Sequence, residues 1–143
     1  MHRYGRKLER FYTHSPYVAE FWNTLSNLPF VIIGVLRLWE GADSLRYGLY
    51  TLAGLASAFH HASSQAWTIV VDWIPIATSL AFSWQAFFAM TPVTAFLLLL
   101  ALSTLAADHI WTPTPVPWGH VMWHLLAAIA VDRLYQDYVP TGV

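Results

Sequence analysis

Three histidines, a serine and an aspartate in this sequence have the types and spacings that metal-assisted hydrolysis requires. His120 and His124 are four residues apart, so on a helix both imidazoles lie on one face. Ser57 and His61 have the same spacing, and Asp72 follows His61 by eleven residues. Two histidines from one helix and a third from a neighbouring helix supply three nitrogen ligands for zinc and leave a fourth position for water. This donor set is typical of a catalytic zinc site rather than a structural one.

The reaction expected at such a site is the attack of zinc-bound water on a carbonyl group. Zinc lowers the pKa of its bound water to about 7 and polarises carbonyl oxygens. Asp72 could take the proton from that water or orient it, and Ser57 could donate a hydrogen bond to the oxyanion. A single HxxxH pair is weak evidence for a metal, so the prediction of a metal site depends on the three histidines together with the serine and the aspartate. The adjacent His60 and His61 cannot both face one site, and the spacing to Ser57 favours His61 without excluding His60.

A second group of polar residues lies near the start of the first apolar segment. Glu20, Asn23 and Asn27 are spaced i, i+3 and i+7, which places them along one side of a helix. Such a stripe commonly makes hydrogen bonds between membrane helices, and this is the favoured interpretation. The alternative is a substrate contact or a site for a hard cation, in which Glu9 would supply a further oxygen ligand.

The composition places these polar residues in an unusually apolar chain. Of the 143 residues, 57% are hydrophobic and 10% are charged, whereas soluble domains carry about 25% charged residues. Ionisable groups within apolar spans are costly and by default indicate a functional site. The seven Lys and Arg are scattered and the formal net charge is -1, so nothing favours a nucleic-acid partner. The absence of cysteine excludes disulfides, thiolate metal ligands and cysteine nucleophiles.

The apolar segments predict an all-α, multi-pass integral membrane bundle, with residues 1–143 forming one domain. A span needs about 20 mostly apolar residues, and the runs are too long and too uniform for membrane strands. Five spans are predicted, at Tyr17–Glu40, Asp43–Ser63, Gln65–Met90, Pro92–Ala107 and Pro117–Tyr138. Asp43 is expected as an N-cap, Pro75 as a local kink and Pro92 in a first helical turn.

This topology would gather the candidate site residues on one side of the membrane. The connections are short, which favours an antiparallel bundle in which sequential helices are neighbours. The second span then ends on the face where the third and fifth spans begin. His61 and His120 therefore lie at one depth, although they are far apart in the sequence.

Taken in order along the chain, these motifs resemble the alkaline ceramidase family, within a wider group of membrane hydrolases that includes the progestin and adipoQ receptors. The matching segments are AEFWNTLSN at Ala19–Asn27, Ser57-x3-His61, Asp72-x2-Pro75 and His120-x3-His124. In that family a serine precedes the first zinc histidine by four residues and an aspartate follows it by eleven, a register that selects His61 over His60. The resemblance implies zinc held by the three histidines, with the serine and the aspartate assisting. It also implies hydrolysis of the amide bond of ceramide to sphingosine and a fatty acid.

The chain departs from the family pattern in two ways. Family members have seven spans and five are predicted here, so the substrate cavity must be walled differently. The two missing spans lie between the third span and the last one. Because their number is even, the last helix still begins on the same side of the membrane as His61. The family's N-terminal calcium site uses an Asp-Trp-x-Glu-x-Asn segment and the Glu of AEFWN, but here only Glu20 and Glu9 correspond. Arg6 stands in place of an acidic ligand, which argues against Ca²⁺ and allows a basic side chain to replace its charge.

The sequence therefore predicts a zinc-dependent intramembrane hydrolase that acts on ceramide or a related acyl-amide lipid. One alternative keeps the chemistry and changes the lipid, since the wider group is not restricted to ceramide. The other alternative is a non-catalytic membrane receptor or carrier in which zinc is structural. Ser57 and Asp72 argue against it, because a structural zinc site needs neither residue.

Overall fold

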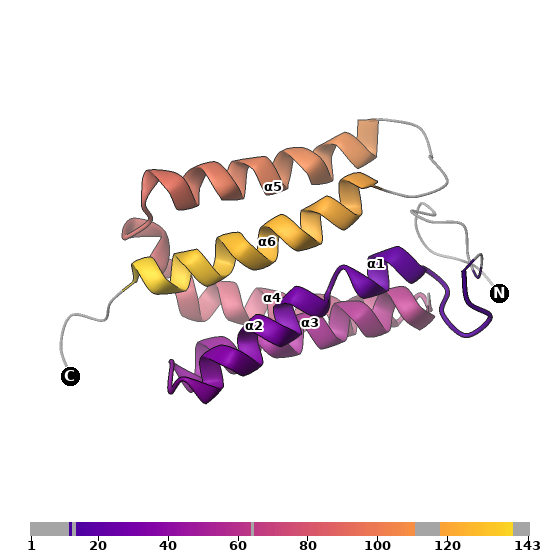
Figure 1. Ribbon diagram of the computed structural model, residues 1–143, viewed down its shortest axis with the longest axis horizontal. Coiled ribbons are helices and arrows are strands. Elements are labelled where there is room, and N and C mark those ends of the chain that lie inside the picture. Colours follow the sequence, from indigo (N-terminus) through magenta and orange to yellow (C-terminus); the bar gives the residue numbers. More distant parts are fainter. Residues whose placement is uncertain (1–11, 13, 64, 111–117, 139–143) are drawn as a thin grey trace.

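The computed structural model describes residues 12, 14–63, 65–110 and 118–138, and the regular secondary structure among them is helical, with no strand. The helices run roughly along the long axis of the molecule (Figure 1). They are α1 (Phe21–Leu25), α2 (Leu28–Trp39), α3 (Ser44–Ser63), α4 (Thr68–Ser83), the 3₁₀ helix η1 (Trp84–Phe88), α5 (Pro92–Ile110) and α6 (Trp118–Asp137). The predicted all-α class is confirmed for the part of the chain that is described.

The first predicted helix, Tyr17–Glu40, is interrupted after Leu25, where the sequence suggested a continuous element. Pro29 explains the break, because a proline ring clashes with the carbonyl four residues earlier, here that of Leu25, and offers it no N–H. Ser26 and Asn27 form a short turn between α1 and α2. Both residues keep right-handed helical dihedrals.

The other helix boundaries agree closely with the prediction, except at the end of the third helix. There α4 ends at Ser83 and η1 leads toward α5, whereas one helix was expected as far as Met90. Asp43 is an N-cap as predicted, since its Oδ1 accepts a hydrogen bond of 2.9 Å from the backbone N–H of Arg46. Pro92 is the first residue of α5, where its fixed φ and missing N–H are tolerated.

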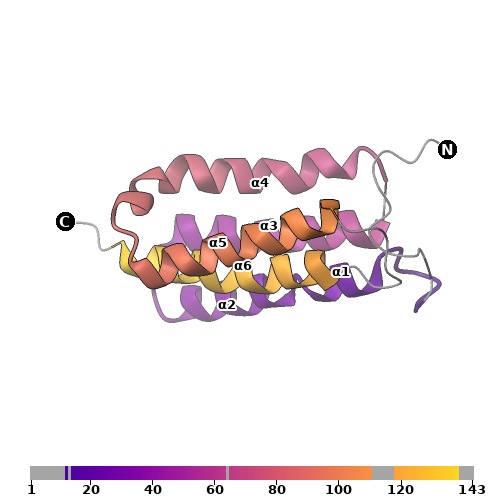
Figure 2. The same ribbon diagram turned by 90° about the horizontal axis from the view of Figure 1, so that it is seen from above.

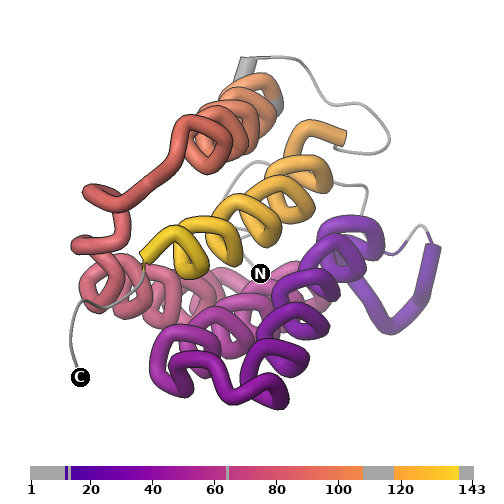
Figure 3. Tube along the Cα trace, turned by 60° about the vertical axis from the view of Figure 1, so that its left-hand side comes forward, coloured from indigo at the N-terminus to yellow at the C-terminus, as the bar shows by residue number. Residues whose placement is uncertain are grey.

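The helices fall into two groups that meet along α6. The α5 and α6 helices pack against each other, and α3 lies between α2 and α4 (Figure 2). Figure 3 shows the α5–α6 pair set apart from α2, α3 and α4. Contacts of α6 with α1 and α2 join the two groups.

Small residues let α2 approach α3 closely. A Cβ added at Gly34 would lie 2.0 Å from Thr51 Oγ1, and one added at Gly54 would lie 2.5 Å from Phe30 Cβ. Helix packing through small residues is typical of membrane bundles, because the hydrophobic effect does not drive helices together in lipid. Glycine at these two positions therefore sets the distance between α2 and α3.

A tyrosine-rich cluster holds α6 against α2 and α3. Its buried members are Tyr47, Tyr50, Ala128 and Tyr135. The Tyr50 hydroxyl donates a hydrogen bond of 2.8 Å to the carbonyl of Ala128, one turn after His124. One turn further along, Asp132 accepts two hydrogen bonds from Arg37, at 2.9 and 3.1 Å. These contacts fix α6 along its axis, and with it the position of its histidines.

Among the described residues, one helical stretch is long and apolar enough to cross a membrane. It is Phe21–Trp39, which includes the turn between α1 and α2. Pro92–Ala107 is a shorter apolar helical stretch.

Candidate metal centre

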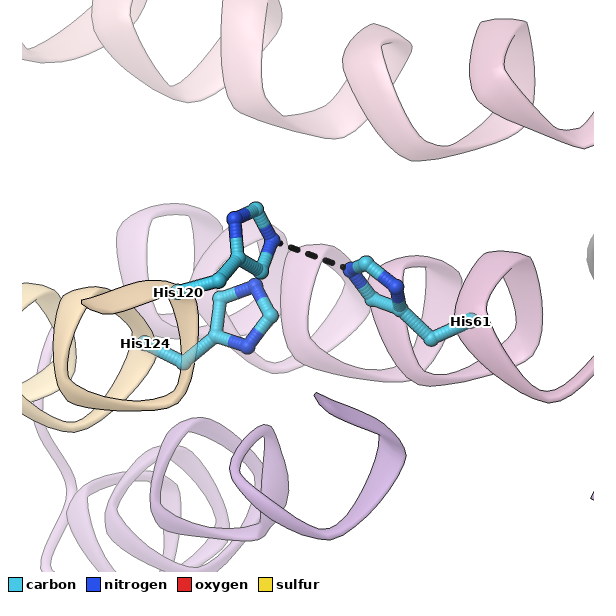
Figure 4. A group of neighbouring side chains, drawn as sticks. All are labelled: His61, His120 and His124. Carbon is cyan, nitrogen blue, oxygen red and sulfur yellow. Dashed lines mark hydrogen bonds between the residues drawn. The ribbon is translucent and has the colours of Figure 1, made fainter. Parts of the chain in front are cut away.

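The structure brings the three predicted zinc ligands together at one end of the bundle. His61 lies in the last turn of α3, and His120 and His124 lie in the first two turns of α6. Their rings face one another (Figure 4), and one nitrogen from each lies within 4.8 Å of the others. His61 and His124 are buried, whereas His120 is half-buried. The position and the burial both suit a metal site that keeps one side accessible.

The converging nitrogens are the Nε2 atoms. Nε2 of His120 lies 3.3 Å from Nε2 of His61. Nδ1 of His61 is hydrogen-bonded to Glu20, and Nδ1 of His124 to Ser26, so each of these rings has Nε2 left for a ligand bond. Two nitrogens bound tetrahedrally to zinc at 2.0–2.1 Å are about 3.3 Å apart. The observed separation and the all-imidazole donor set therefore fit Zn²⁺.

Ser57 and Asp72 lie next to each other beside these histidines. Ser57 is buried one turn before His61 on α3, and Asp72 lies near the start of α4, which packs along α3. The Ser57 hydroxyl donates a hydrogen bond to the Asp72 carboxylate, which also interacts electrostatically with His61. Asp72 Oδ1 is shielded from solvent and has no hydrogen-bond partner among the described residues. That oxygen is a proton acceptor not used by the fold.

His60 is not one of the three converging residues and makes a local contact instead. Its Nδ1 lies 2.8 Å from Thr68 Oγ1. The Thr68 hydroxyl donates to the carbonyl of Gln65 at 2.7 Å, so the His60 ring is the donor in the first bond. This bond joins the end of α3 to the start of α4.

The predicted polar stripe of Glu20, Asn23 and Asn27 packs directly behind the histidines. The Glu20 carboxylate accepts hydrogen bonds from His61 Nδ1 at 2.5 Å and from Asn23 Nδ2 at 3.3 Å. Asn27 Nδ2 donates to the carbonyl of Asn23 at 2.9 Å and lies 3.3 Å from His124 Nδ1. These are the contacts of the hydrogen-bonding interpretation. Glu9, the further ligand of the alternative cation site, lies outside the described residues.

Ser26 belongs to this layer but was not among the predicted site residues. Its Oγ lies 2.7 Å from His124 Nδ1 and donates to the carbonyl of Asn23 at 2.8 Å. Ser26 keeps right-handed helical dihedrals, and its backbone N–H donates to the carbonyl of Trp22 at 2.9 Å, as within a helix. The signal in the sequence was its i, i+3 spacing to Asn23, which places the two side chains next to each other on one side of a helix.

Comparison with protein families gives one match. A family model described as Ceramidase matches residues 9–117, more than half of the chain. The matched range includes Ser57, His61 and Asp72, and it ends before His120 and His124. Comparisons with curated proteins and with solved structures found no match.

Proposed function

We propose, from the premise that this chain belongs to the ceramidase family, that it is a zinc-dependent hydrolase embedded in a membrane. Membership supports amide-bond hydrolysis and a lipid substrate, and we propose ceramide or a related acyl-amide lipid. The observation that carries the metal-dependent chemistry is the convergence of three imidazole nitrogens from α3 and α6. Two of these ligands, His61 and His120, are separated by 59 positions in the sequence.

The distribution of side chains supports a membrane-embedded bundle with several spans. Large apolar side chains on the outer faces of α2, α4 and α5 are exposed, among them Ile32, Val35, Leu36, Val70, Trp73, Ile74, Phe96, Leu99 and Leu102. Side chains with hydrogen-bonding groups are buried instead, among them Glu20, Asn23, Asn27, Ser57, His61, Thr68 and His124. Lipid solvates apolar side chains but cannot satisfy polar groups, which must find partners inside the bundle. We propose that α1 and α2 together form the first span.

In the proposed reaction, Asp72 is the general base and Ser57 stabilises the oxyanion. Zn²⁺ held by His61, His120 and His124 would lower the pKa of water and polarise the substrate carbonyl. Asp72 Oδ1 accepts a proton from the attacking water as the water oxygen bonds to the amide carbon. Asp72 then passes this proton to the amide nitrogen and the C–N bond breaks. The products are a free amine, which is a sphingoid base when the substrate is ceramide, and a fatty acid.

The hydrogen bond between Ser57 and Asp72 connects these two roles. Ser57 donates to a charged carboxylate before the reaction, and hydrogen bonds to charged acceptors are about twice as strong as neutral ones. Once Asp72 has taken the proton, it is a weaker acceptor. The oxyanion is then the better acceptor, so the Ser57 hydroxyl turns to it when charge develops there.

The test is to measure the zinc content and lipid hydrolysis of the purified chain in detergent. Substrates are ceramides of several acyl lengths, with other acyl amides and esters as comparisons. His124→Ala should lose both zinc and hydrolysis, because it removes a buried ligand. His60→Ala is the matched control and should keep zinc, since His60 faces Thr68.

Two results would contradict this function. Full hydrolysis by zinc-free His124→Ala would exclude the proposed chemistry. Zinc bound by the wild-type chain without turnover of any lipid tested would favour the non-catalytic alternative. Hydrolysis of a lipid other than ceramide would keep the mechanism and change the substrate.

A further inference from the structure

The segment before α1 is fastened to the end of α3 through its backbone. The N–H groups of Ala19 and Glu20 donate to the carbonyls of Ala62 and His61 at 2.9 and 3.0 Å. Carbonyls in the last turn of a helix have no partner within that helix and must find one elsewhere. Glu20 satisfies one of them, and this fixes its backbone beside His61.

The Glu20 side chain contacts the same histidine. The carboxylate is buried and lies 2.5 Å from His61 Nδ1. Because an ionised carboxylate only accepts hydrogen bonds, the proton between these atoms belongs to Nδ1. The Nε2 lone pair of His61 is therefore directed at the other two histidines. A carboxylate that accepts from the rear nitrogen of a metal-binding histidine fixes the ring and raises its basicity.

The second buried histidine is held in the same way by a neutral group. The Ser26 hydroxyl has one proton, which it donates to the carbonyl of Asn23 at 2.8 Å. In its 2.7 Å contact with His124 Nδ1, the hydroxyl is then the acceptor. His124 consequently also presents Nε2 to the centre. One segment, from Glu20 to Ser26, thus orients a ligand on α3 and a ligand on α6.

The charge of Glu20 points to a cation on the far side of the ring. Among the described residues, the Glu20 carboxylate contacts His61 and Asn23, and with its proton on Nδ1 and a lone pair on Nε2 the His61 ring carries no charge. A buried carboxylate without a compensating charge is strongly unfavourable. A divalent ion bound at Nε2 would supply that charge through the imidazole.

We propose that Glu20 is a positioning residue of the metal centre, which sets the tautomer, the ring orientation and the basicity of His61. This inference rests on the proposed zinc site and assigns to Glu20 a role behind a ligand rather than in a separate cation site. It makes Glu20 a determinant of zinc affinity itself, independently of catalysis.

The experiment measures Zn²⁺ affinity by chelator competition on the full chain in detergent. Glu20→Gln keeps an acceptor oxygen and loses the charge. Glu20→Asp keeps the charge, but its side chain is one methylene shorter, which moves the carboxylate away from His61 Nδ1. Both should weaken zinc binding by about 10- to 100-fold, the usual effect of losing such a partner. Glu40→Gln is the matched control, because Glu40 has an exposed carboxylate that follows the end of α2 and pairs with Arg37. Its zinc affinity should equal that of the wild type.

The visible spectrum of bound Co²⁺ gives a second readout that a purely structural role would not move. Glu20→Asp should alter this spectrum, since the His61 ring is reoriented. Wild-type zinc affinity in both Glu20 variants would overturn the inference and leave the proposed function intact. Absence of zinc binding in the wild type would overturn both. If Glu20→Gln does not fold, the test rests on Glu20→Asp alone, and wild-type zinc affinity in that variant would overturn the inference.

Discussion

Gly54 offers a quantitative test of how closely the first span approaches α3. A Cβ at this position would lie 2.5 Å from Phe30 Cβ and 3.3 Å from the carbonyl oxygen of Asn27. Phe30 Cβ is attached to its backbone, so rotation of the side chain cannot relieve the overlap. Carbon atoms are in normal contact at about 3.5–4.0 Å, and α2 must therefore shift by about 1 Å to accept Gly54→Ala.

The cost of this shift can be separated from helix propensity. Overpacking a close contact lowers the free energy of unfolding by about 1–3 kcal/mol. Alanine is favoured over glycine within a helix by about 1 kcal/mol, which leaves a net loss of about 0–2 kcal/mol for Gly54→Ala. Gly48 lies earlier on α3, and a Cβ there would have nothing within 4 Å. Gly48→Ala carries the propensity gain alone, so the two variants should differ by about 1–3 kcal/mol.

The assay is equilibrium unfolding in detergent micelles, followed by circular dichroism on both variants. Zinc affinity is measured on the same samples. Gly54→Ala should also weaken zinc binding, because the displaced carbonyl belongs to Asn27, whose amide lies 3.3 Å from His124 Nδ1. Equal stabilities and equal zinc affinities for the two alanine variants would refute this account of the helix contact.

Two further predictions concern the groups that hold α6 and the turn. Asp132→Ala should lower the free energy of unfolding by about 3 kcal/mol, because it leaves a partly buried Arg37 without its main partner. Glu40→Gln, on the exposed side of the same arginine, should cost less than about 1 kcal/mol, and equal losses in an unfolding assay would contradict the ranking. Pro29→Ala should let α1 continue into α2 and raise the helical content, because it restores an N–H and removes the ring that clashes with the carbonyl of Leu25. Ser26 already has helical dihedrals, so zinc affinity by chelator competition should stay close to that of the wild type, and a large loss would contradict this account of the turn.

The sequence predicts the gathering of the histidines because that depends on simple geometry. Four-residue spacing places His120 and His124 on one face, and the order of antiparallel helices brings the end of α3 to the start of α6. Both features depend only on helix periodicity and on the number of helices between the motifs. The helix boundaries marked by Asp43 and Pro92 also agree with the structure, because N-capping and the fixed φ of proline are local signals.

The support behind the candidate ligands was less predictable because it depends on tertiary contacts. Helix periodicity places Ser26 next to Asn23, at i+3, but does not say which helix packs against this side of the segment. In the structure α6 packs there, and Ser26 Oγ lies 2.7 Å from His124 Nδ1. The partner of Glu20 was equally hidden, since a buried glutamate next to asparagines suits a cation site as well as a hydrogen bond to His61.

The short first segment explains how a bundle in two groups can hold the proposed metal centre. One proposed ligand lies on α3 and two lie on α6, and these helices belong to different groups. At the end away from the histidines, Arg37 and Asp132 tie α2 to α6 through a bidentate pair. At the metal end, the segment from Glu20 to Ser26 bonds to both α3 and α6, so it closes the same gap with hydrogen bonds to the ligands themselves. In addition to the tyrosine-rich cluster, the fold therefore connects the two groups at the candidate metal centre, and relative movement of α3 and α6 is limited where it would separate the Nε2 atoms.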